Sequence, residues 1–376
     1  MRAVGVDPGT GSFDVVAVED GRVVSSRSIP TDRVAREPEL LVELVLSLDA
    51  DVIVAPSGYG VPVTRGDEVL DARRFALEVL LLSSESDVNR GVSGGEFGVL
   101  VYDALAKTVE ALLERARSKT IFIPSVILLP TVPWWRKINK IDMGTADKLA
   151  SAYLAVYELQ EREGGFEKVN AVVAELGFGY NAAVAVRRGL IVDGVGGTMA
   201  STGVITAGCL DLEVVAGAGC WSRWDILKGG LAELGAISLE KAGSEVLEAY
   251  AENVAKDVAK ALVSTPEAEI VVVTGRHARV EEVRKLLQEK LRDVQVVELR
   301  GLPGAGSVKE AAQGYALLGL DLAGGLEERL ASRMRIDEAC GTVADHLIHP
   351  RAAELKRRIR ESYSSTVAKP RFCHSI

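Results

Sequence analysis

The chain opens with an acidic residue placed directly before a small glycine turn. Residues 4–18 read VGVDPGTGSFDVVAV, so one apolar run ends at Asp7 and a second begins after the turn. The turn residues are Gly9, Thr10, Gly11 and Ser12. Glycines allow backbone amides to approach an anion closely, and a carboxylate next to bound phosphate suits Mg²⁺, which prefers oxygen ligands and keeps several waters. These residue types predict a turn that holds phosphate groups and a metal ion.

The residues after this first turn (residues 9–12) predict a strand instead of a helix. FDVVAV is followed by Asp20-Gly21, a typical hairpin dipeptide, and then by RVVSSRSI. A P-loop or a dinucleotide-binding turn needs a helix directly after its glycines, with the phosphate at the helix N-terminus. We therefore expect a glycine-rich β-hairpin.

The same pattern occurs a second time. Residues 172–194 align with residues 4–26 without a gap, at a constant offset of 168. In this alignment Glu175 falls on Asp7, and the next two matches are Gly177 and Gly179. A second repeat relates residues 50–58 to residues 268–275. An internal repeat of this kind predicts two copies of one α/β domain. We expect the second turn (residues 177–180) to face the first across a cleft, so that both grip one polyphosphate.

Three segments in this order resemble the motifs of the actin-like ATPase superfamily. VDPGTGS resembles its first phosphate motif, ELGFGYN its second, and IVVVTGRHARVEEVRKLL its adenosine motif. The resemblance implies an α/β fold of two duplicated ribonuclease H-like domains that face each other across a nucleotide cleft. Within the superfamily, the chain resembles the acetate and butyrate kinase branch. Over nearly its whole length it is similar to an archaeal uncharacterised family labelled predicted butyrate kinase.

The resemblance also implies a division of the chain and a set of ligands. We expect an N-terminal actin-like domain at 1–145, a C-terminal nucleotide-binding domain at 146–330, and a tail at 331–376 that packs back on the first domain. The implied cofactors are ATP and Mg²⁺, with Asp7 as the metal residue. The implied nucleotide-binding residues are Gly9, Thr10, Gly11, Ser12, Glu175, Gly177, Gly179, Asn181, Gly275, Arg276, Gly304 and Gly306.

The implied activity is phosphoryl transfer from ATP to a small-molecule acceptor, and the branch favours a carboxylate. The chain departs from the branch at Glu175, where the kinases carry His, and at Tyr59, where they carry Arg; the nearest cation is Arg65. An alcohol acceptor benefits from a carboxylate base, whereas a carboxylate acceptor needs cations. The segment 131–150, which is expected to cross between the halves, supplies both kinds of group. Asp142 and Asp147 are possible bases, Lys148 and Arg136 are possible clamps, and Asp142, Lys148 and Arg65 are our candidate catalytic residues.

Other interpretations stay open at this point. DMGTADK could simply be a helix N-terminus capped by Thr145, with Lys148 in solvent. The chain could be an ATPase that couples hydrolysis to domain closure on a partner protein. It could also be a non-catalytic nucleotide-binding relative, which the large side chains of Phe178 and Tyr180 in the second turn favour.

Composition restricts the partners. The formal net charge of −9 argues against a nucleic-acid partner or an anionic membrane surface. No apolar run is long enough to span a bilayer. The four cysteines lack metal-ligand or disulfide-framework spacing, so we expect reduced thiols in a cytoplasmic protein. A homodimer is possible.

Several local structures are also expected. The pattern predicts helices over 94–119, 146–161, 238–264 and 350–363 and a strand over 120–130. Ser307 and Glu310 have the spacing of a capping box. Trp134 and Trp135 are expected to pack at the domain interface.

Overall fold

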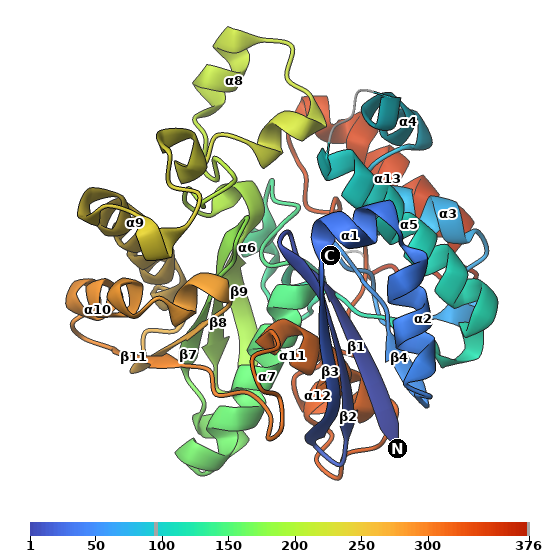
Figure 1. Cartoon of the computed structure of the whole chain (residues 1–376), viewed down its shortest axis with the longest axis horizontal. Coiled ribbons are helices and arrows are strands. Elements are labelled where there is room, and N and C mark those ends of the chain that lie inside the picture. The colour runs from blue at the N-terminus through green and yellow to red at the C-terminus, as the bar shows by residue number, and fades with distance from the viewer. Residues whose placement is uncertain (94–96, 374–376) are drawn as a thin grey trace.

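A computed structural model describes residues 1–93 and 97–373 of the chain. Two β-sheets form the centres of two halves (Figure 1). The first has the order β3-β2-β1-β4-β6-β5 and the second β11-β10-β7-β8-β9. The first sheet contains β1 (Arg2–Pro8), β2 (Ser12–Glu19), β3 (Arg22–Pro30), β4 (Val52–Val54), β5 (Thr64–Arg65) and β6 (Thr120–Phe122). The second contains β7 (Ala171–Leu176), β8 (Asn181–Arg187), β9 (Leu190–Val195), β10 (Ile270–Thr274) and β11 (Gln295–Glu298).

The predicted duplication is confirmed by strand pairing. β1 pairs antiparallel with β2 and parallel with β4, and β7 pairs in the same way with β8 and β10. A register shift lies between Ala17 and Val18 in the first half and between Ala185 and Val186 in the second, again 168 residues apart. The two hairpins therefore share even this irregularity, which locally increases the twist of each strand pair.

Both hairpins also turn in the same way at their far ends. Asp20 and Gly21 have φ of 48° and 70°, and Arg188 and Gly189 have φ of 51° and 76°. Two consecutive positive φ angles are typical of a type I′ turn, whose twist matches that of the flanking strands.

Helices cover the outer faces of the sheets and fill the space between them. The helices are α1 (Thr31–Arg36), α2 (Glu39–Ser47), α3 (Ala72–Arg74), α4 (Glu85–Ser93), α5 (Phe97–Arg115), α6 (Trp134–Lys137), α7 (Ala146–Glu163), α8 (Leu212–Ala218), α9 (Ser244–Leu262), α10 (Glu281–Lys290), α11 (Glu310–Leu322), α12 (Leu330–Arg333) and α13 (Ala353–Thr366). One buried apolar cluster joins α1, α2 and α5 to the first sheet, and another joins α9 and α10 to the second.

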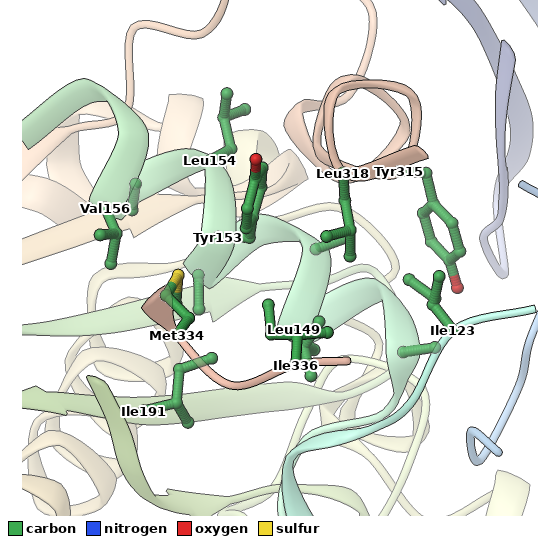
Figure 2. Packing of buried hydrophobic residues seen from close by; sticks show 14 of the residues in the cluster. Ile123, Leu149, Tyr153, Leu154, Val156, Ile191, Tyr315, Leu318, Met334 and Ile336 are labelled. Atoms are coloured by element: carbon green, nitrogen blue, oxygen red, sulfur yellow. The ribbon is translucent and has the colours of Figure 1, made fainter. Parts of the chain in front are cut away.

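A third apolar cluster lies between the sheets, where α7 and α11 pack against each other. Figure 2 shows side chains of the two helices, among them Tyr153 and Leu318, meeting in this layer. Glycines allow the close approach, because a Cβ on Gly314 would lie 2.1 Å from the Ala150 carbonyl oxygen. α11 also packs on β1 of the first sheet, although its residues fall in the range predicted for the second domain. The boundary at 145/146 therefore stays a prediction.

The C-terminal segment contacts the first half. Leu70 donates its amide to the Thr366 carbonyl at 2.8 Å, and Ser362 Oγ donates to Glu78 at 2.7 Å. A disulfide joins Cys340 and Cys373, so the expectation of four reduced thiols was wrong for this pair. Their 33-residue separation carried no recognisable spacing pattern, and only the return of the tail brings them together.

Several expected local structures differ from the observed ones. The helix expected over 350–363 is α13, which begins three residues later, at Ala353. The strand expected over 120–130 ends at Phe122, because the chain turns at Pro124 into a short 3-10 helix, Val126–Leu128. α9 begins at Ser244, six residues later than expected. α5 begins at Phe97, and residues 94–96 of the helix expected over 94–119 lie outside the described residues.

An arm within residues 199–243, around α8, projects from the second half (Figure 1), whereas Val204 and Leu239 near its two ends are buried in the core of that half. Its side chain Trp224 packs edge-on against Tyr102 of α5, with ring centroids 5.5 Å apart. The arm thus touches the first half as well. Within the described part of the chain, no helix combines the length and apolar character needed to cross a membrane.

Candidate nucleotide site between two turns

The first and second turns lie against each other. A Cβ built on Gly179 would lie 2.7 Å from Thr10 Oγ1. A Cβ on Gly11 would lie 3.4 Å from Arg276 Nη1 and 3.6 Å from the Phe178 ring. The duplicated strands therefore bring the two glycine turns to one place, as the repeat predicts.

The first turn is held by hydrogen bonds around its glycines. The Gly9 amide donates to the Ser12 carbonyl at 3.0 Å, and Thr31 Oγ1 donates to the Gly9 carbonyl at 2.8 Å. Ser12 Oγ donates to Asp14 Oδ2 at 2.8 Å. Asp7 ends β1 behind the turn and is buried. Thr10, at the tip, is exposed.

The sequence reasoning missed a lysine in the first turn. Lys309, directly before α11, places its ammonium 2.9 Å from the Ser12 carbonyl, 3.0 Å from Asp14 Oδ2 and 3.4 Å from Asp7 Oδ2. One sequence signal could have indicated it, because Lys309 lies between a glycine loop and a helix. The packing of that helix on β1, which brings the lysine to the turn, appears only in the structure.

A second ammonium group lies beside the second turn. Lys148, near the N-terminus of α7, lies 2.5 Å from Asp147 Oδ2 and 2.7 Å from Glu175 Oε2. Thr145 precedes α7, but its hydroxyl donates to Asp147 at 2.5 Å and does not cap the helix. The alternative in which Lys148 is solvated was wrong, because its side chain is only 13% exposed.

Burial and mutual charge shift the pKa values of this cluster. Burial raises the pKa of Asp7 to about 7, although Lys309 opposes the shift. Burial also raises the pKa of Glu175, against the effect of Lys148. For Asp147, burial is the largest single effect and acts upward, but the charge of Lys148 and the hydrogen bonds from Lys148 and Thr145 together lower the pKa. Burial would lower the pKa of Lys148, and its two carboxylate partners hold that pKa well above its ordinary value.

Asp142 is enclosed by glycines of the second half. A Cβ on Gly197 would lie 2.5 Å from Asp142 Oδ2, and one on Gly196 2.8 Å from Oδ1. The Gly144 amide donates to Oδ1 at 2.8 Å. Burial raises the pKa of Asp142 to about 6. A carboxylate with a pKa in this range can accept a proton near neutral pH.

A buried polar network lies next to the second turn and includes Asn181, the residue that follows it. Tyr250 donates its hydroxyl to Asn181 Oδ1 at 2.8 Å and lies 3.3 Å from His277 Nδ1. Burial lowers the pKa of His277 to about 4, so this ring is neutral at pH 7. Asn181 Nδ2 is buried and has no hydrogen-bond partner within the described residues. It is an unpaired donor beneath the turn.

The turn at Gly275, which the sequence analysis relates to adenosine, is hydrogen-bonded to the start of α11. Gly275 has φ of 89°. Glu310 Oε2 accepts from the Thr274 hydroxyl at 3.0 Å and from the Gly275 amide at 3.4 Å. The expected capping box with Ser307 is absent, because α11 begins at Glu310 and its N-cap residue is Lys309, which gives no side-chain cap. The Arg276 guanidinium stacks 4.7 Å above the Phe178 ring, which connects this turn to the second turn.

The remaining expected residues lie farther from the turns. A Cβ on Gly304 would lie 2.7 Å from the Val23 carbonyl of β3, whereas Gly306 is open to solvent. Arg65 is exposed on β5, three strands away from β1, which corresponds to about 14 Å across the sheet. Arg136 donates to the Val192 carbonyl of β9 at 2.7 Å.

The two tryptophans do not pack where they were expected. Trp134 and Trp135 are 49% and 60% exposed and contact each other edge-on. The expectation that they pack at the domain interface was wrong.

The space at the turns is largely filled by side chains. Lys309 lies within the first turn, and Phe178 with Arg276 lies between the turns. A hollow of about 870 Å³ lies elsewhere, between α7 and β11, and is lined by residues such as Glu158 and Gln295. It is remote from the glycine turns, so we do not assign it to the nucleotide.

The residues around Asp7 do not fit a divalent ion as they are arranged. Across residues 1–93 and 97–373, no group of three His, Cys, Asp or Glu side chains is placed to hold a metal. One oxygen atom each of Asp7, Asp14 and the Ser12 carbonyl already surrounds the Lys309 ammonium.

Comparisons with known proteins agree with the fold. The sequence model of a family described as "Protein of unknown function (DUF1464)" matches residues 5–349. No curated protein matches the sequence. A propionate kinase from Francisella tularensis subsp. tularensis SCHU S4 superposes with a TM-score of 0.52 at 13% identity, over 84% of this chain and 98% of that one.

Two other solved structures are similar at lower scores. An acetate kinase from Entamoeba histolytica has a TM-score of 0.48 at 13% identity, over 78% of this chain and 86% of its own. An acetate kinase from Porphyromonas gingivalis has a TM-score of 0.49 at 12% identity, over 83% and 97%. The chain has the two-domain actin-like ATPase fold.

Proposed function

Because the chain belongs to the DUF1464 family, whose function is unknown, its activity has to be inferred from its site, and we propose that it transfers a phosphoryl group from ATP to a small-molecule acceptor. The observation that carries the proposal is the meeting of two duplicated glycine turns, with Thr10 against Gly179. Phosphoryl transfer needs mainly positioning and charge stabilisation. Turn amides and the two lysines supply both.

The chain's own residues have distinct tasks in this proposal. The amides of the two turns bind the phosphate groups, and the unpaired Nδ2 of Asn181 is a further donor beneath the second turn. The Gly275 turn holds the adenosine, positioned by Glu310. Since Thr10 and Gly179 are in contact, the nucleotide enters when the halves separate and is sequestered when they close.

The finer proposal concerns the acceptor. The resemblance to acetate and butyrate kinases favours a carboxylate, which would give an acyl phosphate. A hydroxyl acceptor is the second candidate, and one observation favours it. Asp142, with a pKa raised to about 6, can take the proton of a hydroxyl group, whereas Lys148 is already paired with two carboxylates.

One experiment separates these acceptors. The protein is incubated with ATP and Mg²⁺, either with short carboxylates and hydroxylamine or with small alcohols and a coupled assay for ADP. Hydroxamate formed only with a carboxylate supports the acyl phosphate, and alcohol-dependent ADP supports the hydroxyl acceptor. ADP released equally without any acceptor would replace the proposal by an ATPase that acts on a partner protein.

Variants connect the activity to the turns. Asp7→Asn and Gly179→Val should each lower turnover by at least about a hundredfold, since preorganised groups at phosphoryl sites contribute this much. Asp293→Asn, an exposed carboxylate in the turn before β11, is the matched control and should leave turnover unchanged. If ATP binds without any turnover, the chain is the non-catalytic relative.

A further inference from the structure

The ammonium of Lys309 lies in a pocket of three oxygen atoms supplied by the first hairpin. These are the Ser12 carbonyl at 2.9 Å, Asp14 Oδ2 at 3.0 Å and Asp7 Oδ2 at 3.4 Å. Asp7 and Asp14 are 3% and 2% exposed. Two buried carboxylates this close need a positive charge between them. Lys309, directly before α11, supplies it.

The first turn is shaped around this lysine. A Cβ built on Gly9 would lie 2.0 Å from Lys309 Nζ, so any side chain at position 9 would occupy the ammonium's place. Gly9 does not have a positive φ, so its backbone conformation is open to other residues. A Cβ at position 9 would also lie 2.8 Å from the Ser12 carbonyl oxygen, so both the backbone of the turn and the approach of Lys309 favour glycine here.

The spacing of the three oxygen atoms suits an ammonium group. Distances of 2.9 and 3.0 Å are ordinary for N–H···O hydrogen bonds. Mg²⁺ would require oxygen atoms at about 2.0–2.1 Å. Metal and ammonium would also place two positive charges at the same point, so they cannot share the three oxygen atoms.

We infer that Lys309 is the resident cation of the first turn and that it excludes divalent metal from Asp7 and Asp14 while it stays there. A metal ion reaches these carboxylates only after Lys309 has turned to another anion, such as a phosphate group. The metal-binding capacity of the first turn is therefore set by the residue directly before α11, outside the hairpin itself.

A Mn²⁺ titration without nucleotide tests the inference, because free Mn²⁺ is read directly by electron paramagnetic resonance. Wild-type protein should bind Mn²⁺ at least about tenfold more weakly than Lys309→Met, in which the two carboxylates are left without their cation. Lys309→Gln, which keeps most of the side-chain volume, should behave like Lys309→Met. Lys285→Met, which removes an exposed lysine of α10, should behave like wild type.

A double variant assigns the bound ion to the first hairpin. Lys309→Met/Asp14→Asn should lose the Mn²⁺ that Lys309→Met gains. Circular dichroism confirms that each variant is folded, and the glutamine variant decides the question if the methionine variant is not.

Two results would overturn the inference. One is Mn²⁺ binding by wild type that Asp7→Asn abolishes, since a metal would then lie beside Asp7 with Lys309 present. The other is a folded Lys309→Gln that binds no more Mn²⁺ than wild type. The titration contains no ATP and is independent of the turnover assays. The inference about Lys309 can therefore be wrong while the proposed phosphoryl transfer is right, and the proposed transfer can be wrong while the inference is right.

Discussion

Replacing Lys148 by Met should strongly destabilise the chain. The Lys148 ammonium is 13% exposed and lies 2.5 Å from Asp147 and 2.7 Å from Glu175. Removing it leaves two buried carboxylates facing each other without a cation. Breaking a buried ion pair by removing one partner costs about 3–5 kcal/mol, a large part of the roughly 5–15 kcal/mol that holds a typical protein folded.

Urea unfolding followed by circular dichroism measures the change in the free energy of unfolding, which shows as a lower urea midpoint. Glu175→Gln should cost less than Lys148→Met, because Asp147 remains as a partner for the ammonium. The double variant Lys148→Met/Glu175→Gln should cost less than the sum of the two single variants, since one of the uncompensated carboxylates is gone.

The pH dependence gives a second check. The pKa of Asp147 is lowered in the folded chain, so the stability it contributes is present above its unfolded pKa and is lost as pH falls through the folded pKa. In Lys148→Met the cause of the lowering is absent. The variant should therefore be least stable, relative to wild type, at neutral pH and should approach it in acid.

The exposed pair of Lys285 and Glu281 provides the control. Lys285→Met should leave the free energy of unfolding nearly unchanged, because exposed ion pairs contribute little. A Lys148→Met variant as stable at pH 7 as the Lys285→Met control would refute the reasoning, because Lys148 would then not compensate buried charge.

Three further predictions concern other parts of the molecule. Burial raises the pKa of Asp7 to about 7, so this carboxyl destabilises the fold as pH rises from about 4 to 7. Asp7→Asn should therefore raise the melting temperature at pH 8 more than at pH 4, in metal-free buffer, and an equal shift at both would contradict the raised pKa. Reduction of the disulfide between Cys340 and Cys373, 33 residues apart, should lower the free energy of unfolding by up to about 4 kcal/mol. Dithiothreitol should lower the urea midpoint of wild type but not of Cys340→Ser/Cys373→Ser. Gly5→Ala should destabilise by about 2 kcal/mol or more, because its Cβ would lie 2.4 Å from the backbone of α11. Gly217→Ala, with no atom within 4 Å of its Cβ, should be neutral or stabilising, and equal effects of the two would rule out close packing at Gly5.

Short local sequence patterns predicted the hairpins well. The dipeptide Asp20-Gly21 and its counterpart Arg188-Gly189 specify turns through φ angles that few residues adopt. The helix over 146–161 was also recognisable, because its apolar spacing is regular and Gly164 ends it in a left-handed conformation. Beyond Phe122, by contrast, an apolar run looked like a strand and is not one. Periodicity alone does not separate a strand from other buried segments.

The candidate site was predicted in part. The glycine turns, Asp7, Lys148 and Glu175 lie together. The gapless repeat related the turns, Asp7 and Glu175, whereas Lys148 was selected as a cation in the segment that joins the halves. Lys309 was missed because it is 302 residues from Asp7 in the chain. Arg65 was selected as the nearest cation in sequence, yet it lies on an edge strand away from the turns.

By itself the sequence determined the two hairpins, their duplication and the acid that precedes each glycine turn, since these depend on local backbone conformation and on residues close together in the chain. Only the tertiary structure decided which charges meet. The packing of α11 on β1 brings Lys309 to Asp7 and Asp14, and the packing of α7 on the second sheet brings Lys148 to Glu175. Pairing of buried charges depends on distances of a few ångströms between distant segments, and no local pattern in a chain records them.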